Sequence, residues 1–237
     1  MQQLKLGAIT VDVIQKDIKN VHLSVYPPTG KVRIAAPERM NLDTIRIYAI
    51  SKLGWIKKQQ TRFKNQERES PREYISRESH YYKGKRYLLR ITEKNEIPQV
   101  KLKPGTIELQ VRPNSTQQKR QAILDEWYRN YLKEQVAKYI DQWEPVIKVK
   151  VADFGIKKMK TKWGTCNREA KRIWINLELA KKPAQSLEYI VVHEMIHLLE
   201  RTHNQKFIAW MNHFLPQWRS YKEELNRLPV SHREWKY

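Results

Sequence analysis

The pattern His193-Glu194-Met195-Ile196-His197 constrains this chain more than any other feature of its sequence. It lies in an apolar stretch between Leu187 and Leu199, where the spacing of apolar residues predicts a buried helix. On a helix, residues four apart lie about 40° from each other in projection, so both imidazoles can reach one metal ion from one face. The glutamate between them can act as a general base towards a metal-bound water. The pattern therefore predicts a core helix that carries a metal site and an acid–base group.

A catalytic zinc site needs a third protein ligand and an open coordination position. His203, six residues after His197, is the leading candidate, because the chain must turn back there and neutral imidazole is a preferred ligand. Glu223 or Glu224 on a later helix is the alternative. In the metzincin pattern a glycine stands three residues after the second histidine and allows the turn. Here that position is Glu200, so we expect the turn to be made differently.

The first half of the chain has the patterns of several strands and two helices. Alternating apolar residues around a Pro-Pro-Thr-Gly turn predict a hairpin over 21–34, and apolar residues at three- and four-residue steps predict a helix over 41–64 capped by Asn41. Strands are expected at 87–91, 100–102 and 107–111, followed by a long helix over 117–142 that Pro145 closes.

The second half mixes helix and strand. Strands are expected at 149–154 and 171–179, and helices over 184–201, 205–214 and 216–226. The fold class is therefore α+β. We expect a basic, β-rich N-terminal region over residues 1–112 and a second domain over 113–237, which includes the long helix.

The charge of the chain suggests anionic partners. Its 237 residues have a formal net charge of +21, and residues 1–120 alone carry 25 basic and 11 acidic side chains. Such a surface attracts a nucleotide or nucleic acid, although a basic, solvated surface without a specific partner has the same composition.

Several classes of protein are excluded. Cys166 is the single cysteine, which excludes an intramolecular disulfide and a four-cysteine zinc site. We interpret it as a small apolar residue rather than a nucleophile. The start has no signal-peptide pattern and the longest apolar run is too short to cross a bilayer, so we expect a cytoplasmic location and no membrane partner.

Several stretches together resemble the YgjP-like zincin metallopeptidases, which are related to the WLM and SprT-like proteins. The resemblance rests on residues 160–166 (Lys-Thr-Lys-Trp-Gly-Thr-Cys), 173–177, 188–198 and 203–207, with 54–56 and 82–87 upstream. It covers most of the chain, from about Asp12 to Asn226. Thr165, where the family more often has serine, and Met195-Ile196 inside the histidine motif are conservative departures.

The resemblance implies a zincin-like C-terminal domain with an HExxH active-site helix and an edge strand. It implies a Zn²⁺ ion on His193, His197 and His203, with Glu194 as the base. It also implies that the strand at 173–177 borders the cleft as the edge strand, where main-chain pairing would suit an extended peptide.

Further residues are candidates for contact with the substrate. Lys160, Lys162 and Trp163 precede the expected edge strand, and Trp174 and Asn176 lie within it. For Trp163 we favour packing in the core, because tryptophan is largely buried in most folded proteins.

These features lead us to expect a zinc-dependent metallopeptidase that acts on a peptide or protein substrate. One alternative is a zinc-dependent nucleotide phosphohydrolase of the UTP pyrophosphatase type. The phosphates of its nucleotide substrate would then contact Lys160, Lys162 and Arg201. Another is a DNA- or RNA-associated zincin that processes proteins. A peptidase needs an open strand edge, a nucleotide hydrolase needs cations converging near the metal, and a nucleic-acid binder needs a continuous basic face.

Overall fold

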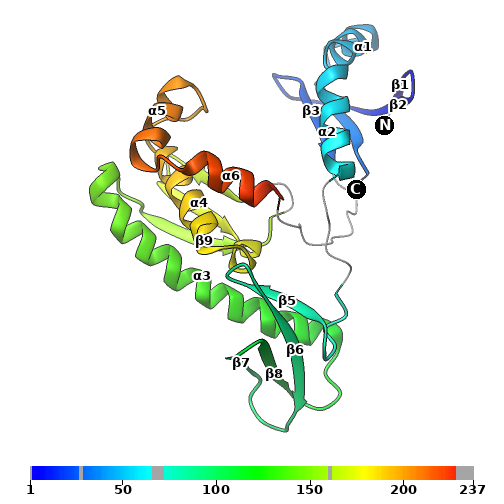
Figure 1. Ribbon diagram of the computed structural model, residues 1–237. Helices are drawn as coiled ribbons and strands as arrows, with labels where there is room; N and C mark the ends of the chain where they lie inside the picture. The colour runs from blue at the N-terminus through cyan, green and yellow to red at the C-terminus, as the bar shows by residue number, and fades with distance from the viewer. Residues whose placement is uncertain (1, 27–28, 66–71, 160–161, 228–237) are drawn as a thin grey trace. The chain divides into compact units, whose positions relative to one another are not determined.

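Buried apolar residues form two separate cores in the computed structural model, which describes residues 2–26, 29–65, 72–159 and 162–227 (Figure 1). Contacts divide the chain into one unit of residues 1–69 and another of residues 70–231, and each is described by itself. By these contacts, residues 70–112 group with the second unit. The domain boundary between residues 112 and 113 stays a prediction from the sequence.

The first unit consists of a four-stranded sheet and two helices. Its elements are β1 (Gln2–Leu6), β2 (Ile9–Lys16), β3 (His22–Tyr26), β4 (Lys31–Pro37), α1 (Leu42–Ser51) and α2 (Leu53–Asn65). The strand order is β1-β2-β4-β3, with β2 and β4 parallel and the other pairs antiparallel. Val11 and Ile34 from the sheet and Ile45 and Ile56 from the helices are fully buried in its core.

The predicted hairpin is confirmed by β3 and β4, whose antiparallel register pairs Val25 with Val32. Its turn residues 27–28 lie outside the described residues. The predicted cap of α1 is also confirmed, because the Asn41 side-chain oxygen accepts a hydrogen bond from the Thr44 N–H at 2.8 Å. The strands β1 and β2 that precede this hairpin were not predicted.

The prediction of a single helix over 41–64 is wrong, because this stretch forms the two helices α1 and α2. Lys52 leaves the helical conformation, with φ −104° and ψ 3°, and separates α1 from α2. The apolar spacing continues across this break, so the sequence pattern does not reveal it. The one local sign of the break is Gly54, which lowers the helix propensity there.

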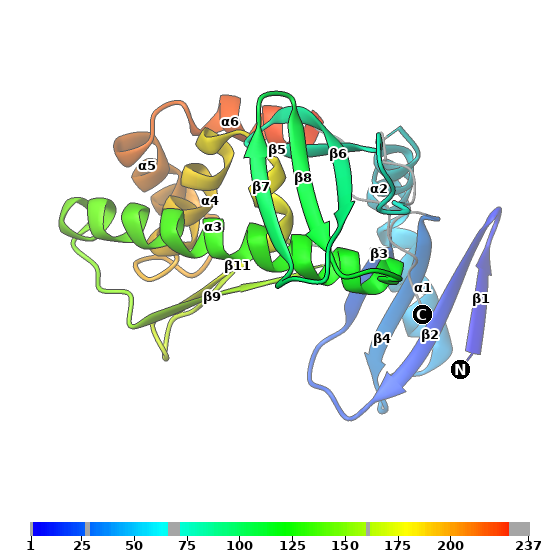
Figure 2. The same ribbon diagram turned by 90° about the horizontal axis from the view of Figure 1, so that it is seen from below.

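The second unit begins with another four-stranded sheet. Its strands are β5 (Ser79–Tyr82), β6 (Lys85–Glu93), β7 (Gln99–Lys103) and β8 (Thr106–Val111), in the order β5-β6-β8-β7, which confirms the three strands predicted over 87–111. The sheet packs on α3 (Gln117–Ile147), where the Tyr128 hydroxyl donates to the Tyr81 carbonyl at 2.8 Å. Figures 1 and 2 show the sheet beside the first part of α3 and α4 beside its later part. Within the described ranges, no helix combines the length and apolar character that a bilayer span needs.

The end of α3 differs from the prediction. The helix continues to Ile147 and contains Pro145 rather than ending before it. Ile140 and Ile147 are both buried, and this packing outweighs the hydrogen bond that the proline cannot donate. The helix ends at Lys148, which adopts φ 60° and ψ 44° and donates its N–H to the Glu144 carbonyl.

The remaining elements form a three-stranded sheet and three helices around the same core. They are β9 (Asp153–Lys157), β10 (Gly164–Asn167), β11 (Arg172–Asn176), a 3-10 turn η1 (Leu177–Lys181), α4 (Ala184–Ile196), α5 (Gln205–Phe214) and α6 (Trp218–Arg227). The extent predicted for α5 is confirmed, and α6 begins two residues after Pro216. The strand expected at 149–154 lies instead at β9, the strand expected to reach 179 ends at Asn176, and the helix expected to reach 201 ends at Ile196.

The sheet order corrects the position of the edge strand. Residues 173–176 belong to β11, which is the middle strand, with β9 parallel on one side and β10 antiparallel on the other. The edge of the sheet beside α4 is β10. Its sequence, Gly-Thr-Cys-Asn, is short and has no apolar alternation, so its pattern does not indicate a strand.

His80 is fully buried in β5, with its Nε2 atom 2.7 Å from the Glu78 carboxylate. Burial, followed by the positive charge of Arg72, lowers the pKa of His80 to about 4, although Glu78 opposes this shift. Because the pKa in the folded state is below the unfolded value of 6.5, the neutral ring stabilises the fold above pH 6.5. That stability is lost as the pH falls from 6.5 towards 4.

We expect His80→Gln to reduce the acid sensitivity of the fold. From pH 7.5 to pH 5, protonation of His80 in the unfolded state should lower the free energy of unfolding of the wild-type protein by about 2 kcal/mol, a loss that glutamine cannot contribute. Urea denaturation of both proteins at the two pH values measures the difference. Equal losses of unfolding free energy in both proteins would contradict this assignment.

Candidate metal centre

The last turn of α4 brings His193 and His197 to one face. His193 lies inside the helix, and His197 follows its final residue with nearly helical dihedrals, φ −62° and ψ −16°. The two ring centroids are 4.9 Å apart. The four-residue spacing therefore places both imidazoles together, although the motif ends the helix rather than lying in its middle.

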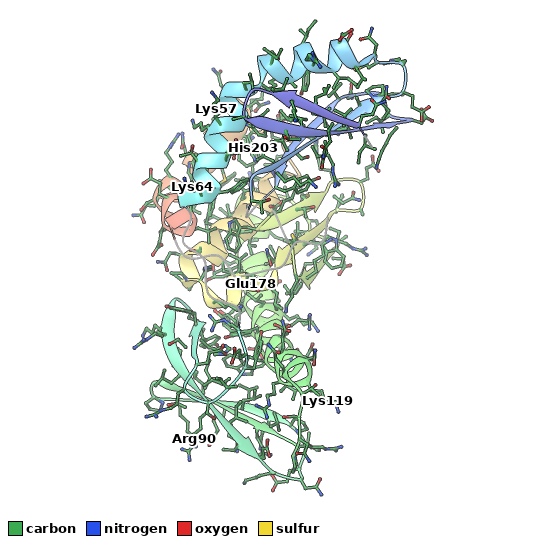
Figure 3. The ribbon with its side chains drawn as sticks, turned by 90° about the vertical axis from the view of Figure 1, so that its right-hand side faces the viewer. Lys57, Lys64, Arg90, Lys119, Glu178 and His203 are labelled. Carbon is green, nitrogen blue, oxygen red and sulfur yellow. The ribbon has the colours of Figure 1, made fainter. Side chains whose placement is uncertain are left out.

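A turn after α4 returns the chain so that His203 meets the other two histidines. The N–H groups of Leu199 and Glu200 both donate to the Ile196 carbonyl at 2.9 Å, which closes this turn without glycine. Asn204 then caps α5, its side chain accepting from the Phe207 N–H at 3.0 Å. His203, which Figure 3 labels, is held between these two hydrogen-bonded ends.

The three histidines are close enough to share one ion. One ligand atom from each of His193, His197 and His203 can be chosen so that all lie within 4.8 Å of one another, and the Nε2 atoms of His193 and His203 are 2.9 Å apart. The ring of Phe207 lies 4.7 to 4.9 Å from all three rings and packs against the cluster.

The acids considered as alternative third ligands are not in this cluster. Among the described residues, the group that could hold a metal consists of the three histidines. Glu224 accepts a hydrogen bond from Gln185 at 3.2 Å, near the other end of α4. His203 is thus the third residue that the fold brings to the pair.

The histidines are in the protonation state that metals bind. Burial lowers the pKa of His193 to about 3, and burial also lowers the pKa values of His197 and His203. His197 donates its Nδ1–H to the Glu200 carbonyl at 3.0 Å, because a carbonyl oxygen can only accept. That bond selects the tautomer with a free Nε2, the usual arrangement at metal-binding histidines.

Glu194, the neighbour of His193 on α4, is buried, with 5% of its surface exposed. Burial raises its pKa to about 8, while the charge of Lys162 acts in the opposite direction. Its carboxylate lies against Gly164, where a Cβ atom would be 2.6 Å from the Glu194 Oε1 atom. The missing side chain at Gly164 therefore lets β10 approach the helix closely.

A half-open cavity of about 490 Å³ separates β10 from the end of α4. Its lining combines the three histidines and Glu194 with further residues of α4, of the turn after it, and of β10 and its adjoining loops: Lys162, Trp163, Gly164, Thr165, Cys166, Arg168, Tyr189, Ile190 and Arg201. Burial raises the pKa of Cys166 to about 11, so this thiol is protonated at neutral pH, as expected for an unreactive cysteine.

The backbone of β10 faces this cavity with unused hydrogen-bonding groups. Asn176 donates its N–H to the Trp163 carbonyl at 2.9 Å, which makes Trp163 and Asn176 a hydrogen-bonded antiparallel pair. Hydrogen-bonded pairs alternate along such a ladder, so the N–H and C=O groups of Gly164 and Cys166 point away from β11. Among the described strands, none pairs with β10 on that side.

The other predicted substrate residues fall into two groups. Lys162 and Trp163 line the cavity, and Trp163 also packs against the core. Lys160 lies outside the described residues. Trp174 and Asn176 are not among the lining residues.

Trp174 and Asn176 support the sheet instead. Trp174 covers Gly155, where a Cβ atom would lie 2.3 Å from the ring, and the Lys157 ammonium lies 4.4 Å from the ring centroid. Asn176 donates its side-chain amide to the Lys162 carbonyl at 2.8 Å. It thereby holds the segment that leads into β10.

Sequence reasoning missed Gly164, Arg168 and Tyr189 as lining residues. Tyr189 could have been found, because it lies one helical turn before His193, and their rings are 5.8 Å apart. Gly164 stands in the stretch 160–166 that carries the family resemblance, which could have indicated it, whereas Arg168 lies outside that stretch and reaches the cavity through the pairing of β10 with β11.

Comparison with known proteins gives few close matches. No curated protein is significantly similar to the chain. Two crystal structures of metallopeptidase zymogens are similar to part of it. Abylysin of Pyrococcus abyssi has 16% identity and a TM-score of 0.36, over 40% of this chain and 99% of abylysin. Jannalysin of Methanocaldococcus jannaschii has 20% identity and a TM-score of 0.33, over 40% and 92% of the two chains. At these TM-scores the likeness carries no argument.

The match to a protein family is extensive. A family model described as "YgjP-like, metallopeptidase domain" matches residues 19–228, which include the three histidines and Glu194. A metallopeptidase domain is a metal-dependent hydrolase of peptides or proteins, and its catalytic metal is usually zinc. The resemblance seen in the sequence is thereby confirmed, and the chain belongs to the YgjP-like metallopeptidase family.

Proposed function

We propose that this protein is a zinc-dependent peptidase in which His193, His197 and His203 hold the metal and Glu194 is the general base. The observation that carries the proposal is the meeting of three neutral imidazoles, within 4.8 Å of one another, with a buried glutamate at one end of an open cavity. Membership of a metallopeptidase family supports the same reaction class.

The donor set fits zinc. Three neutral imidazoles are a common ligand set of catalytic zinc, which keeps a further position open. The hydrogen bond from His197 to the Glu200 carbonyl orients one ligand before any metal binds. A bound Zn²⁺ would polarise the scissile carbonyl and lower the pKa of water.

Glu194 carries the proton transfers in this proposal. Its carboxylate takes a proton from the attacking water as the water oxygen bonds to the scissile carbonyl carbon. The carbon–nitrogen bond then breaks, and Glu194 returns the proton to the leaving amine nitrogen. A pKa near 8 in the buried site favours this exchange, because both protonation states are then accessible near neutral pH.

The outward backbone of β10 positions the substrate. An extended peptide can pair with the free N–H and C=O groups of Gly164 and Cys166 as an added strand. Since Gly164 lies against Glu194, such pairing holds a peptide bond beside the general base. Peptide hydrolysis is favoured because this edge recognises a main chain.

The sequence left two alternatives to a peptidase. The family supports peptide or protein substrates, and it adds nothing for a nucleic-acid partner. Lys162 and Arg201, which were considered for contact with phosphate, do line the cavity. Hydrolysis of a nucleoside triphosphate by the zinc-loaded protein should therefore be measured beside peptide hydrolysis.

We expect Glu194→Gln to abolish peptide hydrolysis while keeping the metal. Glutamine has nearly the same size but cannot accept the proton, so kcat should fall by at least about 100-fold. Hydrolysis of a casein substrate and the zinc content of the purified proteins measure the two effects. An active variant would refute the role of Glu194 as base.

His203→Ala should weaken zinc binding by more than about 100-fold, because a direct ligand is lost. Competition with a chromogenic chelator measures the affinity without relying on activity. Glu224→Ala is the matched control and should bind zinc as the wild type does, because Glu224 is engaged by Gln185. An unchanged zinc affinity in His203→Ala would indicate that Glu223 or Glu224 is the third ligand instead.

Gly164→Ala should lower hydrolysis without removing zinc. The added Cβ atom would lie 2.6 Å from the Glu194 Oε1 atom, so the carboxylate must move away from its position beside β10. We expect a loss of at least about tenfold in kcat, since small misplacements of a catalytic group are costly. Gly54→Ala, where the added Cβ atom meets nothing within 4 Å, is the control. Full activity in Gly164→Ala would show that this contact is not needed.

A further inference from the structure

The cavity beside the histidines is strongly cationic. Lys162, Arg168 and Arg201 line it, and Glu194 is the one carboxyl group among the lining residues that the structure describes. Lys222 on α6 lies close enough for its charge to lower the pKa values of His193 and His203. Positive groups thus line the cavity from the loop before β10, the loop after it and the α4–α5 turn.

One acid near the site is already engaged. The carboxylate of Glu200 accepts hydrogen bonds from the N–H and hydroxyl of Thr202, and its pKa is held low by these bonds and by the charge of Lys206. Glu200 is not among the residues that line the cavity. Its charge reaches His197, whose pKa it raises slightly against the effect of burial, but its carboxylate is not at the cavity wall where a substrate would meet Lys162, Arg168 and Arg201.

The three lining cations differ in how firmly they are held. Arg168 donates to the carbonyls of Leu198 and Leu199, at 3.3 and 3.4 Å, and so is bound to the turn after α4. Among the described residues, the side chains of Lys162 and Arg201 have no hydrogen bond or ion pair. These two side chains can therefore contact a ligand without breaking a hydrogen bond or an ion pair, although the charge of Lys162 also acts on Glu194.

The cations also lie at both ends of the substrate edge. Lys162 precedes β10 and Arg168 follows it, and fully extended chain between them would span at most about 20 Å. A peptide paired along β10 passes both positions, whereas a terminal carboxylate can reach only one of them. Backbone pairing itself has no sequence preference, so side-chain charge is left to select the substrate.

We propose that the substrate of this site is a peptide segment with Asp or Glu side chains on both sides of the scissile bond. This inference rests on the proposed peptidase function and adds the substrate class to it. The carboxylates meet Lys162, Arg168 and Arg201 while the main chain pairs with β10. The net charge of +21 steers such a segment towards the protein, and the local cations orient it.

Matched peptides test this proposal on the full, zinc-loaded chain. The set consists of internally quenched peptides, acetylated and amidated, with two Glu, two Gln or two Lys residues on each side of the same central sequence. We expect kcat/KM to be at least about tenfold higher for the Glu peptide than for the Gln peptide, with the difference shrinking as salt is added. A Gln peptide with a free C-terminal carboxylate separates side-chain recognition from terminal recognition.

A double variant, Lys162→Glu with Arg201→Glu, should reverse the order and prefer the Lys peptide. Arg168 is left unchanged because it holds the turn after α4. Lys133→Glu with Lys138→Glu, both exposed on α3 and outside the cavity lining, makes the same change in net charge and should keep the wild-type order. Binding of the labelled Glu peptide to Glu194→Gln, measured by fluorescence anisotropy, gives a second readout that does not need activity.

The outcomes separate the two proposals. Equal kcat/KM for the Glu and Gln peptides, or a preference that follows the free terminus, overturns the acidic-substrate inference alone. Cleavage of none of the peptides overturns the peptidase function as well. Hydrolysis of a nucleoside triphosphate without peptide cleavage would assign the same cations to phosphate and overturn both.

Discussion

The burial of α4 is the constraint on which the rest of the site depends. Leu187, Val191, Met195 and Ile196 are buried almost completely, so the helix lies inside the core rather than on its surface. An apolar surrounding penalises charge, which is why His193 is neutral and the pKa of Glu194 is raised. The same core holds both groups rigidly, and the helix ends where the metal-binding face opens to the cavity.

The close approach of β10 to α4 completes the candidate site, because residues of both elements line the same cavity. Glycine at position 164 lets the strand lie against Glu194, and the Asn176 amide holds the preceding segment through the Lys162 carbonyl. Both contacts position the backbone of the strand, and neither places a bulky side chain of β10 in the cavity. The outcome is a strand edge whose free hydrogen-bonding groups lie beside the carboxylate.

The sequence predicted local features well and non-local ones poorly. Helical periodicity is local, which explains why His193 and His197 could be paired from their spacing and why the extent of α5 was correct. The position of His203 beside them could also be anticipated, because six residues allow one tight turn. The identity of the edge strand could not be anticipated. The strand β11 lies in the middle of the sheet because it pairs with β9, and no local sequence pattern reveals that pairing. Trp174 and Asn176, the candidates predicted on that strand, do not line the cavity for the same reason.

Cations around a metal site have two opposing effects. Lys222 and Arg168 repel an incoming divalent cation, yet the same charges lower the pKa values of the histidines and so reduce competition from protons. Metal binding to imidazole requires the neutral form, and here burial and neighbouring charge both favour it. In the proposed peptidase, a bound divalent ion would make the positive field of the cavity stronger still, and the carboxylates of the proposed acidic substrate would offset that field beside the peptide bond. Charge that opposes metal binding would therefore favour substrate binding once the metal is bound.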